Sequence, residues 1–171
     1  MALLDILEVP DRRLTAVSAP VARVDDELLR LLDDMLETMY AAPGIGLAAP
    51  QVGVLTRAFV CDLGEEGART PLFVINPEIV ARSPTSNTAE EGCLSLPKQF
   101  GEVTRADRVT LRYLDRTGAV AEVEADGLLA RCLQHEVDHL DGILFVDHLS
   151  TLKRSMILRR MAKARRARAT A

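Results

Sequence analysis

The sequence H-E-x-x-H, which begins at His135, constrains the fold of this chain more than any other feature. It lies in a stretch whose apolar residues recur at helical spacing, namely Leu128, Leu129, Cys132, Leu133, Val137 and Leu140. Asp126 can cap the start of this helix, and Gly142 can end it. Residues four apart stack on a helix, so His135 and His139 can bind one metal ion, with Glu136 beside it as a candidate general base. The alternative is two partly buried histidines with a packing role.

Two histidines leave a catalytic metal site incomplete, because such a site usually takes three protein ligands and water. A metzincin would carry a further histidine where this chain has Phe145, and we interpret His148 as an ordinary surface or strand-end residue. Cys93 and Cys132 are candidates, since thiolates bind iron or zinc well. Cys132 lies about 10.5 Å along the helix from His139, too far for two short side chains to share one ion, so we expect it to line a pocket. Cys93 is the candidate ligand, and a buried thiol is the alternative.

The remaining sequence predicts strands followed by helices, without βαβ alternation. Two hairpins are expected, one from residues 57–63 with 72–80 and one from 108–114 with 119–124. Helices are expected over residues 25–41 and from Ser150 onward, whereas residues 1–24, 44–53 and 83–88 lack a regular period. The predicted fold class is α+β, with antiparallel sheets packed around a central metal-binding helix and with an N-terminal and a C-terminal helix.

Composition limits the classes of protein to which the chain can belong. Its 171 residues are 48% apolar and 27% charged, which fits one domain with a real core and argues against disorder or a coiled coil. The first residues lack a basic region and include Asp5 and Glu8, so no signal peptide is expected. Proline and glycine interrupt the uncharged stretch 38–56, so no membrane span is expected. Three widely spaced cysteines do not suggest a disulfide framework, and a cytoplasmic location is the natural interpretation.

Charge is distributed unevenly along the chain. Eight Lys and Arg residues and no acidic residue follow Asp147, whereas the preceding part has 13 basic and 25 acidic residues. This asymmetry indicates a polyanionic partner for the tail from about residue 150, with RNA the natural one in a cytoplasm. The alternative is a solvated helix face that ends in a frayed terminus.

Three segments, in this order, resemble a known family. They are GIGLAAPQ at 44–51, EGCLS at 91–95 and QHEVDH at 134–139, and together they look like the three signature motifs of peptide deformylases. The opening ILEVPDRRL is similar to that family's N-terminal stretch, so the resemblance extends from about residue 3 to about residue 150. One departure is Arg131, at a helix position where the family more often has an apolar residue near its substrate pocket.

The resemblance implies one catalytic domain over residues 1–171 that removes the formyl group from N-formylmethionyl nascent polypeptides and releases formate. The residues that match the family's ligands to one divalent ion are Cys93, His135 and His139. Ferrous iron is that family's usual ion, and zinc or nickel can substitute. By the same resemblance, Glu136 moves the proton, while Gln51 and the backbone N–H of Leu94 stabilise the oxyanion.

The resemblance also implies how substrate and partners bind. The expected substrate-binding residues are Ile45, Gly46, Glu91, Leu128 and Cys132. The basic C-terminal helix is expected to dock on the ribosome, and neither a membrane nor a sequence-specific nucleic acid is expected as a partner.

Two other functions fit parts of the sequence. A general metallopeptidase would also use H-E-x-x-H, but the cysteine ligand and the GIGLAAPQ segment disfavour it. A non-catalytic binding protein of the same fold would have no need to keep Glu136, Gln51 and Cys93 together.

Overall fold

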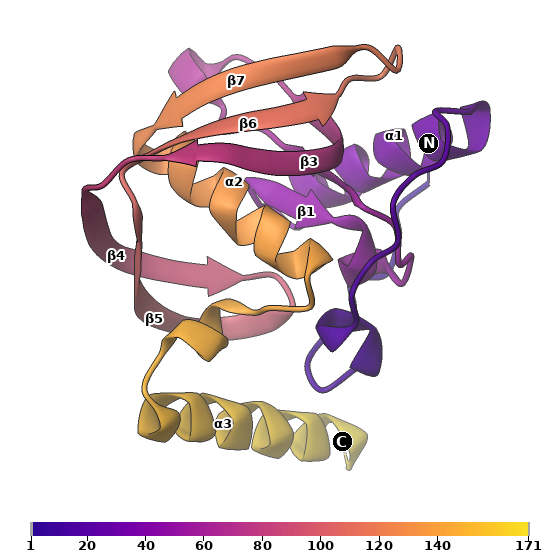
Figure 1. Cartoon of the computed structure of the whole chain (residues 1–171). Coiled ribbons are helices and arrows are strands. Elements are labelled where there is room, and N and C mark those ends of the chain that lie inside the picture. The colour runs from indigo at the N-terminus through magenta and orange to yellow at the C-terminus, as the bar shows by residue number, and fades with distance from the viewer. Residues whose placement is uncertain (1, 171) are drawn as a thin grey trace.

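The computed structural model describes residues 2–170. Its larger sheet is antiparallel with the strand order β1-β2-β3-β6-β7. The strands of this sheet are β1 (Gly46–Ala48), β2 (Ala58–Cys61), β3 (Leu72–Arg82), β6 (Arg108–Leu114) and β7 (Val120–Asp126). The smaller sheet is a hairpin of β4 (Ser86–Cys93) and β5 (Leu96–Ala106). The predicted α+β class with antiparallel sheets is confirmed (Figure 1).

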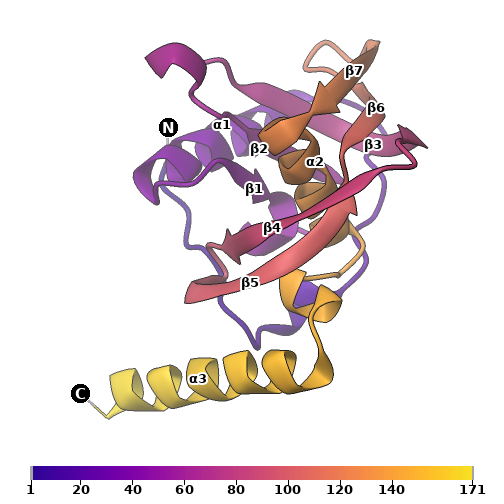
Figure 2. The same ribbon diagram turned by 90° about the vertical axis from the view of Figure 1, so that its left-hand side faces the viewer.

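Helix α2 (Gly127–Leu140) lies between the two sheets (Figures 1 and 2). It contacts β1, β2, β6 and β7 of the larger sheet and β5 of the hairpin. Its apolar face packs against the larger sheet, and the core residues on this face include Ala130, Leu133, Val137 and Leu140. The opposite side of the helix carries Arg131, His135, Asp138 and His139, where both Asp138 and His139 lie about one turn after His135. The polar side chains of α2 therefore face the β4–β5 hairpin.

The larger sheet is covered on both faces. Phe59 and Cys61 of β2 belong to the core cluster that contains α2, whereas Ala58 and Val60 belong to the cluster that contains α1 (Asp26–Ala41). Successive side chains of a strand point to opposite faces, so this short strand is buried on both sides. The helices on the two faces therefore fix where β1 and β2 lie relative to α2.

The C-terminal helix α3 (Thr151–Ala169) lies below the hairpin and apart from the larger sheet (Figure 1). Ser150 caps it by accepting a hydrogen bond from the Lys153 N–H at 3.2 Å. Within the described residues, its buried side chains are those of Ile157 and Met161, which join a cluster with the β4–β5 hairpin. Most of its other residues are exposed to solvent, and all eight of its charged residues are basic.

Two local predictions were wrong. The segment 83–88 is not all loop, because β4 begins at Ser86 and pairs with β5. The strand β1 and a short 3-10 helix, Ala49–Val52, occupy the segment that was expected to be irregular. β4 is mostly exposed and polar, so it lacks the apolar alternation by which strands are recognised. Asp126 occupies the N-cap position of α2, as expected, although its side chain makes no capping hydrogen bond.

None of the helices within residues 2–170 has both the length and the apolar character that a membrane span requires.

Candidate metal centre

Three potential ligand atoms converge where the tip of the hairpin meets α2. The side chains are Cys93 from the end of β4 and His135 and His139 from α2, and their ligand atoms all lie within 4.8 Å of one another. His139 Nε2 is 3.1 Å from His135 Nε2 and 3.5 Å from Cys93 Sγ. Ligands of a tetrahedral ion with bonds of about 2.0–2.3 Å lie roughly 3.3–3.8 Å apart. The three residues therefore fit a small divalent cation.

The environment of these side chains also fits a cation. Burial lowers the pKa of His139 well below its ordinary value, and the neighbouring His135 adds to this effect, so the imidazole is neutral and can bind metal. Within the described chain, the buried His139 Nδ1 has no hydrogen-bond partner. Burial raises the pKa of the Cys93 thiol to about 12, against hydrogen bonds from Ser95. A thiolate here needs a positive counter-charge, which a divalent cation supplies.

The orientation of His135 is set by Glu91. His135 Nδ1 lies 2.9 Å from Glu91 Oε1, while its Nε2 faces the other ligand atoms. Burial alone would raise the pKa of Glu91, but the bonds from His135 and Arg105 outweigh it and hold that pKa well below its ordinary value. An ionised carboxylate only accepts, so Nδ1 carries the proton and Nε2 is free for a metal.

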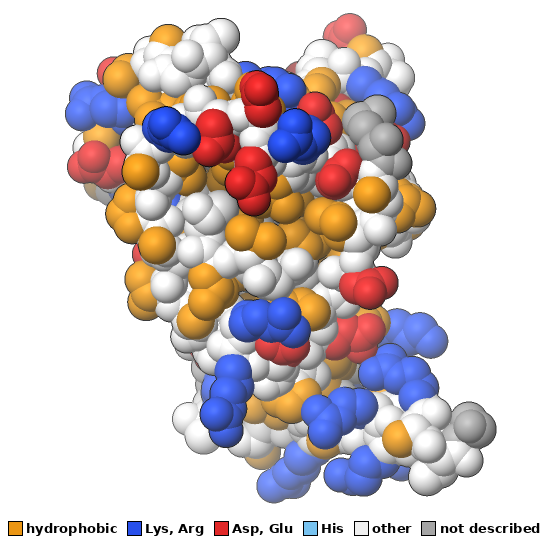
Figure 3. All heavy atoms as spheres, turned by 90° about the vertical axis from the view of Figure 1, so that its right-hand side faces the viewer, with side chains coloured by type: hydrophobic (Ala, Val, Ile, Leu, Met, Phe, Trp, Pro, Cys, Tyr) orange, Lys and Arg blue, Asp and Glu red, His pale blue; other side chains and the backbone are white. Residues whose placement is uncertain are grey.

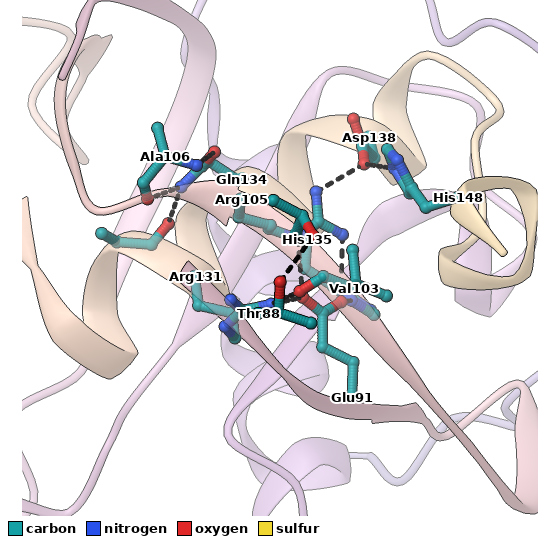
Figure 4. A network of polar contacts seen from close by, with 12 residues as sticks. Thr88, Glu91, Val103, Arg105, Ala106, Arg131, Gln134, His135, Asp138 and His148 are labelled. Atoms are coloured by element: carbon teal, nitrogen blue, oxygen red, sulfur yellow. Dashed lines mark hydrogen bonds and ion pairs between the residues drawn. The ribbon is translucent and has the colours of Figure 1, made fainter. Parts of the chain in front are cut away.

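Glu91 belongs to a larger polar network, which Figure 4 shows in close-up. Arg105 of β5 donates to both Glu91 oxygens, from Nε at 2.6 Å and from NH2 at 3.0 Å. Its NH1 donates to Asp138 Oδ2 at 2.8 Å, and His148 Nε2 lies 2.8 Å from the same oxygen. Arg131 donates to Glu91 Oε2 at 2.6 Å. The chain of contacts runs from a candidate ligand to the surface.

Glu136 lies beside the three ligand atoms with its carboxyl group buried. The residue is 2% exposed, and within the described residues its Oε2 has no hydrogen-bond partner. Burial raises its pKa well above the ordinary value, and the nearby Cys61 adds to the effect. A Cβ on Gly46 would lie 3.0 Å from this carboxyl group and 3.1 Å from Cys132 Sγ. Glycine at position 46 therefore keeps the space in front of Glu136 open.

Gln51 is fixed with its amide nitrogen toward Cys93. Its Oε1 accepts from the Ala48 N–H at 2.9 Å, which determines the orientation of the amide. Its Nε2 lies 3.1 Å from Ser95 Oγ and 3.5 Å from Cys93 Sγ. Gln51 is 1% exposed, so this donor is held rigidly at the wall of the site.

A cavity of about 650 Å³ opens in front of these residues. It is lined by Gln51, Cys93, Leu94 and Glu136, and by every residue that the sequence suggested for substrate binding, namely Ile45, Gly46, Glu91, Leu128 and Cys132. Cys132 lies outside the group of three ligand atoms. The segments 44–51, 91–95 and 134–139 thus meet at one place.

The sequence reasoning missed Arg105, Asp138 and the contact of His148. Arg105 lies two residues after the buried Val103 in β5, so it occupies an inward position of the strand. A charge at such a position is a usable signal, because buried charges are paired or ligate metals. Whether Arg105 points inward could not be determined from the sequence, because the start of β5 was not known. His148, interpreted as an ordinary surface residue, contacts Asp138.

The site combines two histidines one turn apart on a central helix, a cysteine from a hairpin and a buried glutamate beside a cavity. This combination defines a class of protein, the hydrolases with an H-E-x-x-H helix and one candidate metal site. The comparisons with known proteins make this specific. The family model of polypeptide deformylase matches residues 3–155. A peptide deformylase of Alkalilimnicola ehrlichii is 61% identical, covering 95% of this chain and 91% of the relative.

Solved structures agree with the sequence comparison. A peptide deformylase from Ehrlichia chaffeensis is 41% identical with a TM-score of 0.94, covering 98% of this chain and 99% of that one. One from Legionella pneumophila is 46% identical with a TM-score of 0.92, covering 99% of each chain. The chain belongs to the polypeptide deformylase family, which confirms the resemblance seen in three short segments.

Proposed function

We propose that this chain hydrolyses the formyl amide of N-formylmethionyl nascent polypeptides in the cytoplasm and releases formate. Family membership supports the reaction. The observation that carries the chemistry is the buried carboxyl group of Glu136, which faces the cavity beside the ligand atoms of Cys93, His135 and His139. The whole chain would act as one catalytic domain, with α3 as an appendage.

Cys93, His135 and His139 would hold one divalent ion, with ferrous iron the expected one and zinc or nickel as substitutes. When bound, such an ion activates water for attack at neutral pH and polarises a carbonyl group. The Glu91 contact keeps His135 in the tautomer that presents Nε2. The ligands come from a rigid helix and from the tip of a hairpin, which holds them close to the required arrangement before an ion binds.

Glu136 is the general base and then the general acid. Its unpartnered Oε2 can accept a proton from the attacking water and return it to the nitrogen of the leaving methionine. The developing oxyanion needs donors that are already oriented. Gln51 Nε2, which is fixed by the Ala48 N–H at the other end of the amide, supplies one, and we assign the second to the backbone N–H of Leu94 in the turn between β4 and β5.

The cavity wall would bind the methionine side chain and the start of the peptide. Ile45, Leu128 and Cys132 offer apolar surface for the side chain, and Gly46 leaves room for the peptide main chain. Both carboxylate oxygens of Glu91 are already occupied by His135 and arginines. We therefore assign any substrate contact of Glu91 to its backbone, as in the addition of a peptide strand to a sheet edge.

The basic helix α3 would contact the ribosome. Figure 3 shows Lys and Arg side chains gathered over this part of the molecule. Among residues 2–170, the exposed α3 cations that form no ion pair are Lys153, Arg159, Arg160, Lys163, Arg165 and Arg166. Such a cluster suits the phosphates of RNA, which would bring the enzyme to its nascent substrates.

Formate release from a formyl-methionyl tripeptide tests the proposed reaction. We expect the iron-loaded protein, prepared without oxygen, to release formate, and the isosteric variant Glu136→Gln to be slower by about 10²–10⁴-fold. Glu90→Gln is the matched control, because Glu90 also lines the cavity but is exposed. It should retain activity.

Three results would contradict the proposal. One is the absence of formate release by folded protein with one metal ion per chain. Another is an equal rate in the parent and in Glu136→Gln. The third is cleavage of internal bonds in an unformylated peptide at a comparable rate, which would instead support a general metallopeptidase.

A further inference from the structure

Arg131 is the position at which this chain departs from the family resemblance. It borders the cavity, but both terminal nitrogens of its guanidinium group donate hydrogen bonds within the protein. NH1 donates to Glu91 Oε2 at 2.6 Å and to the Val103 carbonyl at 2.8 Å. NH2 donates to the Asn87 carbonyl at 3.0 Å and to Asn87 Oδ1 at 2.7 Å. The residue is 8% exposed. One planar group therefore joins α2 to both strands of the hairpin.

The place of Arg131 on α2 gives these bonds a consequence for the metal centre. It lies one turn before His135 on the same stripe of the helix, and both side chains bond to the carboxylate of Glu91. Arg105 bonds the same carboxylate from β5, so Glu91 is held from three directions (Figure 4). Arg131 is the member of this set that also holds the β4 backbone, at Asn87.

The hairpin needs such an attachment. Within the described residues, β4 and β5 pair with each other and with no strand of the larger sheet. Cys93 stands at the end of β4, two residues after Glu91, so its position relative to α2 depends on how the hairpin is fastened. Gln134 provides a second attachment, through its bonds with the Ala106 N–H and carbonyl at the opposite end of the hairpin.

We propose that Arg131 is a positioning residue of the metal centre, which acts through Glu91 and the β4 backbone to hold His135 and Cys93 at the separation that one metal ion requires. The inference rests on the metal site of the proposed function. It assigns to Arg131 a role in metal affinity rather than in the choice of substrate side chain.

Cobalt(II) binding to the apo-protein tests the assignment without an activity assay. Affinity is measured by competition with a chelator, and the thiolate-to-cobalt absorption band reports the ligand geometry. We expect Arg131→Met to weaken cobalt binding by about 10–100-fold and to shift that band, which is the usual effect of losing a contact behind a ligand. Arg131→Lys, which lacks the planar fork, should fall between the parent and Arg131→Met.

A double-mutant cycle shows whether Arg131 acts through Glu91. Glu91→Gln should weaken cobalt binding by itself, and adding Arg131→Met to it should cost much less than in the parent. Arg116→Met is the matched control. Arg116 is a partly buried arginine in the turn between β6 and β7, and it forms an ion pair with Asp33 of α1. This control should bind cobalt like the parent.

Specific outcomes would overturn the proposal. Unchanged cobalt affinity and an unchanged band in Arg131→Met, or in Arg131→Lys if the methionine variant does not fold, would leave Arg131 with a purely structural role even if the melting temperature fell. Fully additive losses in the double mutant would show that Arg131 does not act through Glu91. Formate release by the parent is scored separately, so a parent that binds cobalt but releases no formate contradicts the proposed function alone.

Discussion

Tyr40, which is half-buried, and Asp62, which is buried, show how two residues far apart in the sequence stabilise each other's protonation states. The Tyr40 hydroxyl donates to Asp62 Oδ2. Burial raises the pKa of Tyr40 to about 12, and the Asp62 carboxylate adds to the effect. Burial would raise the pKa of Asp62 as well, but the Tyr40 bond and the backbone N–H groups of Gly64 and Thr70 outweigh it and lower that pKa.

This pair gives a pH prediction that is independent of metal. The chain has two tyrosines and no tryptophan, so phenolate absorbance near 295 nm reports Tyr40 and Tyr113 alone. Burial also raises the pKa of Tyr113. We expect a step near pH 12 that Tyr40→Phe removes.

The same pair links pH to the free energy of unfolding. The unfolded tyrosine loses its proton near pH 10, before the folded one, so the contribution of Tyr40 is fully present below pH 10 and is lost as pH rises through about 12. Urea unfolding at pH 9 and pH 11 measures the loss, which should be smaller in Tyr40→Phe. A Tyr40 midpoint near pH 10 would contradict both expectations.

The candidate ligands could be predicted from the sequence, whereas the residues behind them could not. His135 and His139 follow from helical spacing alone, which is a local property of the chain. Arg105 meets Glu91 because β4 pairs with β5 in a particular register. Register depends on the hairpin as a whole, and the polar sequence of β4 gives no sign of it.

Among the elements, the helices were the easiest to predict. α1 and α2 have clear apolar stripes, and Asp25 caps the first by accepting from the Leu28 N–H. The alternating strand β6 and its partner β7 were found for the same reason. The β1 strand was missed because its three residues, Gly46 to Ala48, are too few to show a periodic signal. It is a strand through its pairing with β2.

The end of α2 provides a stability prediction. Gly142 has a φ of 75°, and a Cβ there would lie 2.5 Å from the Thr15 carbonyl oxygen. Gly142→Ala should therefore lower the free energy of unfolding by about 2–4 kcal/mol, from backbone strain and a clash with the N-terminal segment. Gly64 has a φ of 65° with no atom within 4 Å of its added Cβ. Gly64→Ala is thus a control for strain alone and should cost about 1 kcal/mol.

Urea unfolding of the metal-free variants measures both effects. An equal loss of unfolding free energy in the two variants would contradict this expectation. It would show that the N-terminal segment moves away from the added Cβ at position 142 without cost.

For the whole molecule, the asymmetry of charge predicts salt-dependent binding to ribosomes. Arg159, Lys163 and Arg166 follow one another at intervals of four and three residues on α3 and are exposed. Changing all three to Glu should weaken co-sedimentation with ribosomes and reduce the slope of log affinity against log salt by about three. The same change at three exposed arginines outside α3, Arg12, Arg23 and Arg82, is the control for net charge. Equal effects of the two triple variants would argue against α3 as the contact.

The candidate ligands come from two separate elements, the β4–β5 hairpin and α2, which are not joined by a β-sheet. In the proposed holoenzyme an ion bound to both is a cross-link that closes residues 94–134 into a ring. An ion that binds only this folded arrangement adds about 4 kcal/mol of stability when its free concentration is a thousand times its dissociation constant. The free energy of unfolding, and with it the resistance to proteolysis, then depends on the free concentration of the ion. A cell short of the ion would contain less of this protein, rather than the same amount in an inactive form.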